Sequence, residues 1–106
     1  MNKSTQNKQD HLDVMRKVGE NRNLTQRDLA YELGFSLGKL NYCMKELKAK
    51  GLIKMNNFKK SKDKIKYIYV LTPGGIVAKT KLTINFMKRK MQEYDQLKKE
   101  LKRAKN

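Results

Sequence analysis

The sequence LTQRDLAYELGFSLGKLNYCMKELKAKG, residues 24–51, contains two capped helical segments separated by a very short turn. Thr25 is a favoured N-cap residue, and Asp28, three positions later, approximates a capping box. Gly34 is a favoured residue just past a helix C-terminus, and Ser36 is a second N-cap. So short a connection makes the two helices cross at a large angle, which predicts a helix-turn-helix.

The second of these helices is expected to run from Leu37 to Lys50 and to end at Gly51. Apolar residues at i, i+3, i+4 and i+7 form its predicted buried stripe, and these are Leu40, Cys43, Met44 and Leu47. Leu24 with Leu29, and Phe35 with Leu40, stand at the positions of hydrophobic staples. At the normal helical pitch the opposite face carries Gly38, Asn41, Tyr42 and Lys45, flanked by Lys39 and Lys48.

After Gly51 the pattern changes to that of a β-hairpin. Residues 52–55 and 65–71 are rich in β-forming side chains, and the segment between them is strongly basic. Its lysines are Lys59, Lys60, Lys62 and Lys64. A basic hairpin after a helix-turn-helix is a wing. Its lysines suit a phosphate backbone, although charge at a sheet edge also serves to prevent aggregation.

Thr72-Pro73 begins a final helix, with Thr as the cap and Pro at the first helical position. The helical pattern runs to about Lys102, and thirty helical residues span ~45 Å, more than a small domain needs for its own core. Residues at alternating spacings of three and four, broken only at Lys98, form an imperfect heptad seam. We expect this seam to dimerise the chain through Val77, Thr80, Ile84, Met87, Met91, Tyr94 and Leu101.

The remaining N-terminal part is expected to be a flexible polar arm over residues 1–9, followed by a short amphipathic helix that Gly19 closes. The predicted organisation is therefore an arm, a winged helix-turn-helix domain over residues 10–72, and a dimerisation helix with a basic tail over residues 73–106. The predicted fold class is mainly α with a small β-hairpin.

Charge is the strongest compositional signal. Among 106 residues, 26 Lys and Arg face 10 Asp and Glu, which gives a formal net charge of +16. A polyanion such as nucleic acid is the usual partner of such a chain.

With a single cysteine (Cys43) and a single histidine (His11), the chain offers no disulfide framework or Cys/His zinc cluster, and we expect no cofactor or metal. No acid–base or nucleophile constellation can be assembled either, so we expect no enzymatic activity.

No apolar stretch approaches the roughly 20 residues of a membrane span, and the first ten residues lack a signal core. The expectation is a cytoplasmic protein with no membrane partner.

Asn suits adenine in the major groove, and Lys suits guanine or a phosphate. The predicted DNA-contacting residues are Thr25, Gln26, Ser36, Gly38, Lys39, Asn41, Tyr42, Lys45 and Lys48, with Lys59, Lys60, Lys62 and Lys64 of the wing.

The stretch from Leu24 to Tyr42 resembles MarR-type winged-helix regulators, most closely the short branch associated with exopolysaccharide gene clusters in bacteria. Ser36-Leu37-Gly38-Lys39 with Asn41-Tyr42, followed by Leu71-Thr72-Pro73, carries the more specific part of the likeness. The resemblance implies a dimeric, site-specific regulator of bacterial or phage transcription whose recognition helix spans residues 36–50.

The chain also departs from that family. Larger MarR proteins have long helices on both sides of the winged domain, whereas here only the last helix is long, so a small-molecule effector is not expected. The Asp-x-Arg signature of the family's wing is replaced by lysines, which make point-charge contacts rather than a bidentate fork.

Two other functions are compatible with the same residues. A basic RNA- or ribosome-associated protein would bind single strands through exposed aromatic side chains, for which Tyr67 and Tyr69 are the paired candidates. A protein-interaction adaptor would use the C-terminal helix and keep the winged fold as a scaffold. Competition between duplex DNA and structured RNA separates the first alternative from DNA binding, and mass in solution together with duplex affinity separates the second.

Overall fold

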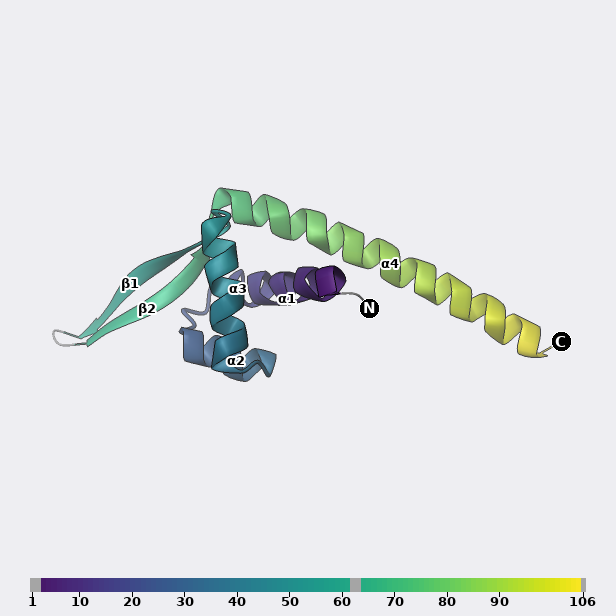
Figure 1. Cartoon of the computed structure of the whole chain (residues 1–106), viewed down its shortest axis with the longest axis horizontal. Helices are drawn as coiled ribbons and strands as arrows, with labels where there is room; N and C mark the ends of the chain where they lie inside the picture. The colour runs from purple at the N-terminus through teal and green to yellow at the C-terminus, as the bar shows by residue number, and fades with distance from the viewer. Residues whose placement is uncertain (1–2, 62–63, 106) are drawn as a thin grey trace.

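The protein is described by a computed structural model that covers the backbone of residues 3–61 and 64–105 and the side chains of residues 5–57 and 67–105. Four helices and one antiparallel hairpin follow in the order α1 (Lys3–Val18), α2 (Gln26–Leu33), α3 (Leu37–Ala49), β1 (Ile53–Ser61), β2 (Lys64–Leu71) and α4 (Pro73–Lys105) (Figure 1). The predicted fold class, a winged helix-turn-helix with a long C-terminal helix, is confirmed.

The N-terminal segment differs from its prediction. Residues 3–9, expected to lie in a flexible arm, form the first turns of α1. Two side-chain hydrogen bonds at i, i+4 spacing stabilise these turns, from Gln6 to Asp10 (2.9 Å) and from Gln9 to Asp13 (3.0 Å). The apolar stripe that follows, from Leu12 to Val18, is buried in the core and anchors the helix. Polar side chains alone are therefore a poor guide to the helix start.

The two helices of the helix-turn-helix begin as the sequence predicts. The Thr25 hydroxyl accepts from the backbone N–H of Asp28 (3.2 Å), and the Asp28 carboxylate accepts from the N–H of Thr25 (3.0 Å). Helix α2 ends at Gly34, whose φ of 68° is the left-handed conformation that glycine adopts without strain. Ser36 then caps α3 by accepting from the N–H of Lys39 (3.1 Å). The short turn between the caps sets the crossing of α2 and α3.

A single apolar core joins α1, α2, α3 and the base of β1. The predicted stripe of α3 is buried within it, and the completely buried side chains include Met15, Leu29, Leu40 and Leu47. Cys43 is a free, buried thiol in this core, and burial is the main cause that raises its pKa. Its placement supports a packing role.

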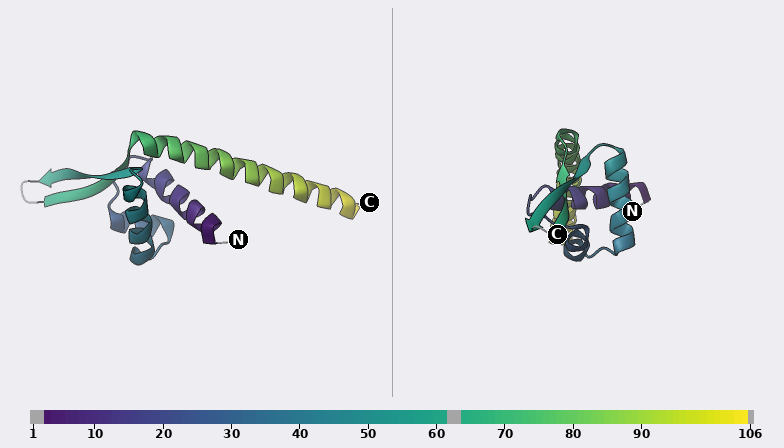
Figure 2. Two further views of the ribbon diagram at one scale, coloured as in Figure 1. Left: turned by 45° about the horizontal axis from the view of Figure 1, so that its top comes forward. Right: turned by 90° about the vertical axis from the view of Figure 1, so that its left-hand side faces the viewer.

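The hairpin leaves the body as a twisted two-stranded ribbon (Figures 1 and 2). Its register pairs Ile53 with Leu71 at the base and Asn57 with Tyr67 further out, and it shifts between Lys59 and Ser61. Ile53 and Ile68 are buried at the base, whereas Met55 and Tyr67 are exposed. Among the side chains that the structure describes, those that join the hairpin to the core, such as Ile53 and Leu71, lie at its base.

The junction between the hairpin and α4 is held by Thr72. Its backbone N–H donates to the carbonyl of Leu52 (3.0 Å), and its hydroxyl donates to the carbonyl of Gly51 (2.6 Å). The same hydroxyl accepts from the N–H of Gly75 (2.9 Å) and so caps α4. Gly75 is buried here, where an added Cβ would overlap the backbone of Leu52.

Helix α4 passes over α1 and then continues well beyond the other elements (Figures 1 and 2), so that the molecule measures 70 × 25 × 23 Å. Ala78 and Leu82, near its start, pack against the core. Residues 87–105 are exposed. Among the described residues, no helix is long and apolar enough to cross a bilayer.

Candidate nucleic-acid interface

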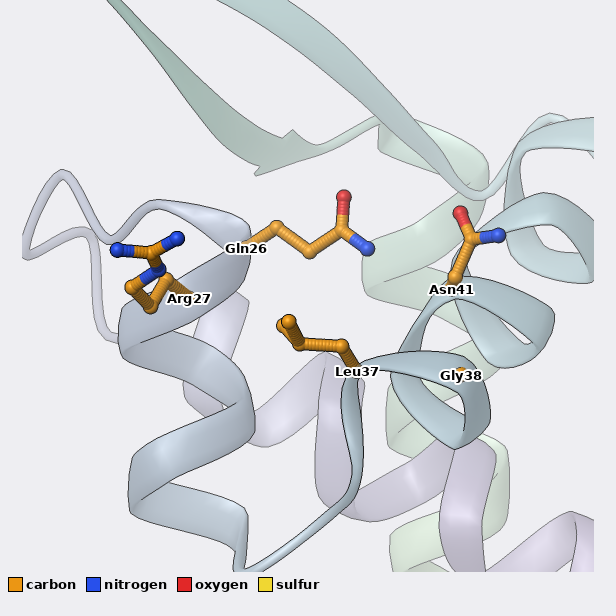
Figure 3. Close-up of a pocket in the computed structure, with 5 residues that line it drawn as sticks. All are labelled: Gln26, Arg27, Leu37, Gly38 and Asn41. Carbon is orange, nitrogen blue, oxygen red and sulfur yellow. The ribbon is translucent and has the colours of Figure 1, made fainter.

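The N-termini of α2 and α3 come together around an open hollow of about 490 Å³ (Figure 3). Gln26 and Arg27 line it from the first turn of α2, and Leu37, Gly38 and Asn41 line it from the start of α3. The amide of Gln26 points across the hollow toward Asn41, as Figure 3 shows. Since helix N-termini carry partial positive charge and unsatisfied N–H groups, this surface favours an anion.

The outer face of α3 is exposed as predicted, and it brings Gly38, Asn41, Tyr42, Lys45 and Lys48 onto one open surface. A Cβ added at Gly38 would meet no neighbouring atom within 4 Å, so nothing in the fold requires glycine there. Tyr42 is the aromatic side chain of this face, and 55% of it is exposed. The face offers amide, hydroxyl and ammonium groups to a ligand.

Three predicted contact residues already have roles inside the protein. The hydroxyls of Thr25 and Ser36 accept the capping hydrogen bonds of α2 and α3. The Lys39 ammonium lies 3.5 Å from the buried carboxylate of Asp10 and 4.1 Å from the centroid of the Phe35 ring. Lys39 is thereby drawn toward α1 and away from the centre of the α3 face.

A polar cluster behind Tyr42 is not predicted by the sequence. Glu46 lies one turn further along α3 from Tyr42. Its carboxylate lies 3.4 Å from Nε2 of His11, a histidine of α1 that is only 8% exposed. The interaction with the Glu46 carboxylate is the main cause that raises the pKa of Tyr42. The signal in the sequence is the i, i+4 spacing of Tyr42 and Glu46.

The structure describes the backbone of three of the four wing lysines. Lys59 and Lys60 lie in β1 and Lys64 begins β2, while Lys62 lies outside the described residues. The side chains of all four are likewise outside them. The backbone of Lys59, Lys60 and Lys64 lies at the far end of the ribbon from α3 (Figure 1).

An exposed apolar stripe runs along α4. It contains the predicted seam residues Val77, Ile84, Met87, Met91, Tyr94 and Leu101, which are 46–64% exposed. Leu97, 62% exposed, borders the stripe beside the Lys98 break and is not predicted as part of it. At about 100° per residue the stripe lies roughly opposite Ala78 and Leu82, which pack on the body. The seam is therefore uncovered in a single chain.

Residues 11–54 match a family model described as winged helix-turn-helix DNA-binding. A search of curated proteins gave no match. The matched segment contains the second half of α1 and all of α2 and α3, so the sequence match and the capped helices agree on the same fold.

Several solved structures share this fold at low sequence identity. Staphylococcus aureus MarR in complex with salicylate and kanamycin is 15% identical with a TM-score of 0.65, over 82% of this chain and 57% of that one. Streptococcus pneumoniae FabT in complex with DNA is 18% identical with a TM-score of 0.61, over 82% and 59%.

A MepR–DNA complex from S. aureus is 20% identical with a TM-score of 0.63, over 90% of this chain and 73% of that one. The chain thus spans less than two thirds of the MarR and FabT chains. At these identities the likeness establishes a MarR-like winged-helix fold.

Proposed function

We propose that this protein is a sequence-specific transcription regulator that binds double-stranded DNA as a homodimer, with α3 in the major groove. The observation that carries the proposal is the exposed polar face of α3, which the helix-turn-helix caps present as one open surface. The major groove is about 12 Å wide and admits an α-helix. The net charge of +16 supports attraction to the duplex.

On the α3 face each side chain has a role that fits duplex DNA. Asn41 suits bidentate contact with adenine, and Lys45 suits guanine or a phosphate. Gly38 lets the backbone approach the duplex closely, because it has no side chain between them. Gln26, from the first turn of α2, faces Asn41 across the same hollow (Figure 3), and we expect it to contact the phosphates that flank the groove.

The wing is proposed to lie along the backbone or at the minor groove. Lys59, Lys60, Lys62 and Lys64 concentrate positive charge near its tip. Lysine contributes point charges that neutralise phosphates and carry no base information. We therefore assign affinity to the wing and specificity to α3.

The homodimer is proposed to form through the apolar stripe of α4. Stripes of this kind are uncommon on the surface of a monomer, and the seam has the three-four spacing that packs helices together. A two-fold pair of α3 helices would read half-sites roughly 10–10.5 bp apart. Two of the structural neighbours, FabT and MepR, are complexes with DNA.

The regulated genes are proposed from the resemblance to the exopolysaccharide-associated branch. Promoters of surface-polysaccharide genes are therefore the first ones to test for binding. Cytoplasmic location and the absence of catalysis follow from the same proposal.

Selection of bound duplexes from random sequence tests this function. We expect a palindromic site, with affinity that falls with salt as it does for about 6–10 neutralised phosphates. Asn41→Ala should lose ~1–3 kcal/mol of discrimination at one base pair in each half-site. Lys60→Ala should weaken all sequences alike and flatten the salt dependence. If structured RNA competes better than the selected duplex, the proposal is wrong.

A further inference from the structure

The charged side chains on and beside the exposed stripe of α4 indicate how a second helix would pack on it. Counted in heptads from Val77, the stripe residues occupy a and d positions, and Lys98 falls at an a position among them. The Lys98 ammonium lies 5.9 Å from the centroid of the Tyr94 ring, so this lysine lies on the stripe rather than away from it. A second helix that packs on the stripe must therefore accommodate a cation.

The position of Lys98 favours one orientation of a helix pair. In a parallel pair each a residue faces its own copy, so Lys98 would meet Lys98 of the partner subunit in an apolar seam, where two ammonium groups repel each other. In an antiparallel pair an a residue faces a d residue, and Lys98 lies against Met87 of the partner subunit. The aliphatic part of the lysine then packs on the methionine, while the ammonium reaches solvent.

Two flanking charges set the register of an antiparallel pair. Lys88 and Asp95 occupy e positions, and neither makes an ion pair with another residue that the structure describes. With Met91 opposite Tyr94 of the partner subunit, Lys88 lies beside Asp95 of the partner subunit, and the two-fold axis repeats this pair. A shift of one heptad in either direction would instead bring two copies of Lys88, or two copies of Asp95, together at the centre.

A parallel pair would use these charges less well. The residue beside Asp95 would then be Lys90 of the partner subunit, and Lys90 already makes an ion pair with Glu93 of its own helix (3.4 Å). The antiparallel register has one unfavourable kind of e pair, Lys81 with Lys102 of the partner subunit. These lysines lie near the ends of the pair, where salt screens their repulsion. The balance of charges therefore favours the antiparallel orientation.

The surroundings of Lys88 lack negative charge. Lys88, Lys8 and Arg89 line an open hollow of about 360 Å³ between α1 and α4. No acidic side chain is among the described residues that line it, and none of the three cations makes an ion pair within that part of the chain. A carboxylate from another molecule is therefore attracted to this hollow. In the register above, Asp95 of the partner subunit supplies that carboxylate.

We propose that α4 pairs with α4 of a second copy in an antiparallel arrangement, with Met91 opposite Tyr94 of the partner subunit and Lys88 paired with Asp95 of the partner subunit. This inference rests on the proposed function, since it assigns a geometry to the proposed homodimer. The free end of each helix covers the stripe of the other, and the winged domains lie at opposite ends. The two copies of Ala78 are then ~43 Å apart along the pair, comparable with the roughly 34–36 Å between half-sites one turn apart.

Disulfide formation between introduced cysteines tests the orientation. Ile84 faces Leu101 of the partner subunit in the proposed pair, and both side chains are exposed in the single chain. Ile84→Cys and Leu101→Cys, mixed under reducing conditions and then oxidised, should form disulfide-linked heterodimers. Either variant alone should form almost none, because its two cysteines lie ~25 Å apart along the pair. The wild type, with its buried Cys43, is the control for background reaction.

Charge reversal tests the register. Lys88→Glu should raise the Kd of dimerisation about tenfold, because two attractive pairs become repulsive. Asp95→Lys should do the same, and the double variant should dimerise as the wild type does. Lys90→Glu is the matched control, because it makes the same change of charge two residues away and should leave the dimer intact. Sedimentation over a range of protein concentrations measures all four variants.

Disulfides formed by Ile84→Cys alone or by Leu101→Cys alone would show a parallel pair and overturn the inference. Loss of the dimer in Lys90→Glu but not in Lys88→Glu would do so as well. A dimer in which no combination of cysteines forms a disulfide would mean that another surface joins the chains, and the inference would again be wrong. A wild type that sediments as a monomer at every concentration would overturn the homodimer of the proposed function too, and that result is distinct from the other three.

Discussion

Glycine at position 38 lowers the stability of helix α3. It occupies the second helical position of α3, and a side chain there would meet no atom within 4 Å. Alanine should therefore stabilise the protein, by up to ~1 kcal/mol. If the backbone must approach DNA at this point, Gly38→Ala should at the same time weaken binding to the selected duplex. Thermal unfolding and a duplex titration measure the two effects on one variant.

Gly74 supplies a control at the same helical position of α4. A Cβ on it would make only ordinary contacts, the nearest at 3.7 Å. Gly74→Ala should raise stability in the same way and leave duplex affinity unchanged. Equal affinity of Gly38→Ala and the wild type would show that the glycine serves no close approach.

Single residues are predictable where a local rule applies to them. Thr25, Asp28, Gly34 and Ser36 can be assigned because caps and helix-ending glycines depend on the immediate sequence. The proximity of Glu46 to His11 cannot be predicted in this way, because His11 lies on another helix. For the same reason the sequence places Lys39 on the contact face without any sign of the buried carboxylate of Asp10.

At the scale of elements, the start of α4 depends on a close backbone approach. A Cβ at Gly75 would overlap the carbonyl oxygen of Leu52 and lie 2.9 Å from its carbonyl carbon, and neither atom belongs to a flexible side chain. Gly75→Ala should therefore destabilise the protein by about 1–3 kcal/mol, as overpacking does. Chemical denaturation should show the loss, whereas the neighbouring Gly74→Ala should show a gain. A neutral Gly75→Ala would mean that the junction adjusts freely.

The connection between α1 and α2 carries a charge cluster that makes stability depend on pH. The hydrogen bond from Arg22 is the main cause that lowers the pKa of Glu32 below its usual 4.5, and Lys17 adds to it. A lowered carboxyl pKa contributes stability above the unfolded value and loses it as pH falls through the folded value. The wild type should therefore be more stable than Glu32→Gln near neutral pH.

The difference between these two proteins should shrink as the pH is lowered below 4.5. Urea denaturation at several pH values measures it, and the high exposure of the cluster makes the effect small and sensitive to salt. Glu93→Gln, in an exposed pair on α4, is the comparison for general charge effects. A constant difference across pH would contradict the assigned role of Arg22.

The helices and strands are predicted by the periodicity of apolar residues, but the ends of these elements are not always predicted. The helix-turn-helix, the hairpin and the continuous final helix are all predicted. The N-terminal turns of α1 are not, because their polar sequence has no apolar period and their stability comes from i, i+4 hydrogen bonds and the anchored stripe behind them. Nothing in the sequence pattern shows that Gly75 is required, and its close contact with Leu52 is seen only in the fold.

For the whole molecule, the main feature is apolar surface on α4 that a single chain leaves exposed. The compact body buries its own core, while the exposed part of α4 carries Met87, Met91, Tyr94, Leu97 and Leu101 without a covering element. The sequence predicts most of this stripe from its spacing. Whether such a helix packs back onto its own domain or extends away from it depends on its direction at the junction formed by Thr72 and Gly75. That direction is a property of the fold and cannot be predicted from the spacing of apolar residues.

Met91 lies in the middle of the stripe and is 62% exposed, which makes it the position where a charge should do most harm to a dimer and least to the monomer fold. Met91→Glu would bring two carboxylates into an apolar helix interface. We expect sedimentation to show a monomer, and affinity for a two-half-site operator to fall steeply while the melting temperature at low protein concentration stays near that of the wild type.

Gln96→Glu adds the same negative charge at an exposed site about 140° further around the helix, off the stripe. It should remain dimeric and lose only the small, salt-sensitive part of DNA affinity that one charge accounts for. The comparison separates the geometric contribution of the stripe from its electrostatic one, because both variants change the net charge equally. If Met91→Glu sediments as the wild type does, α4 is not the dimer interface, and the pairing of two α3 helices at a fixed spacing would need another surface.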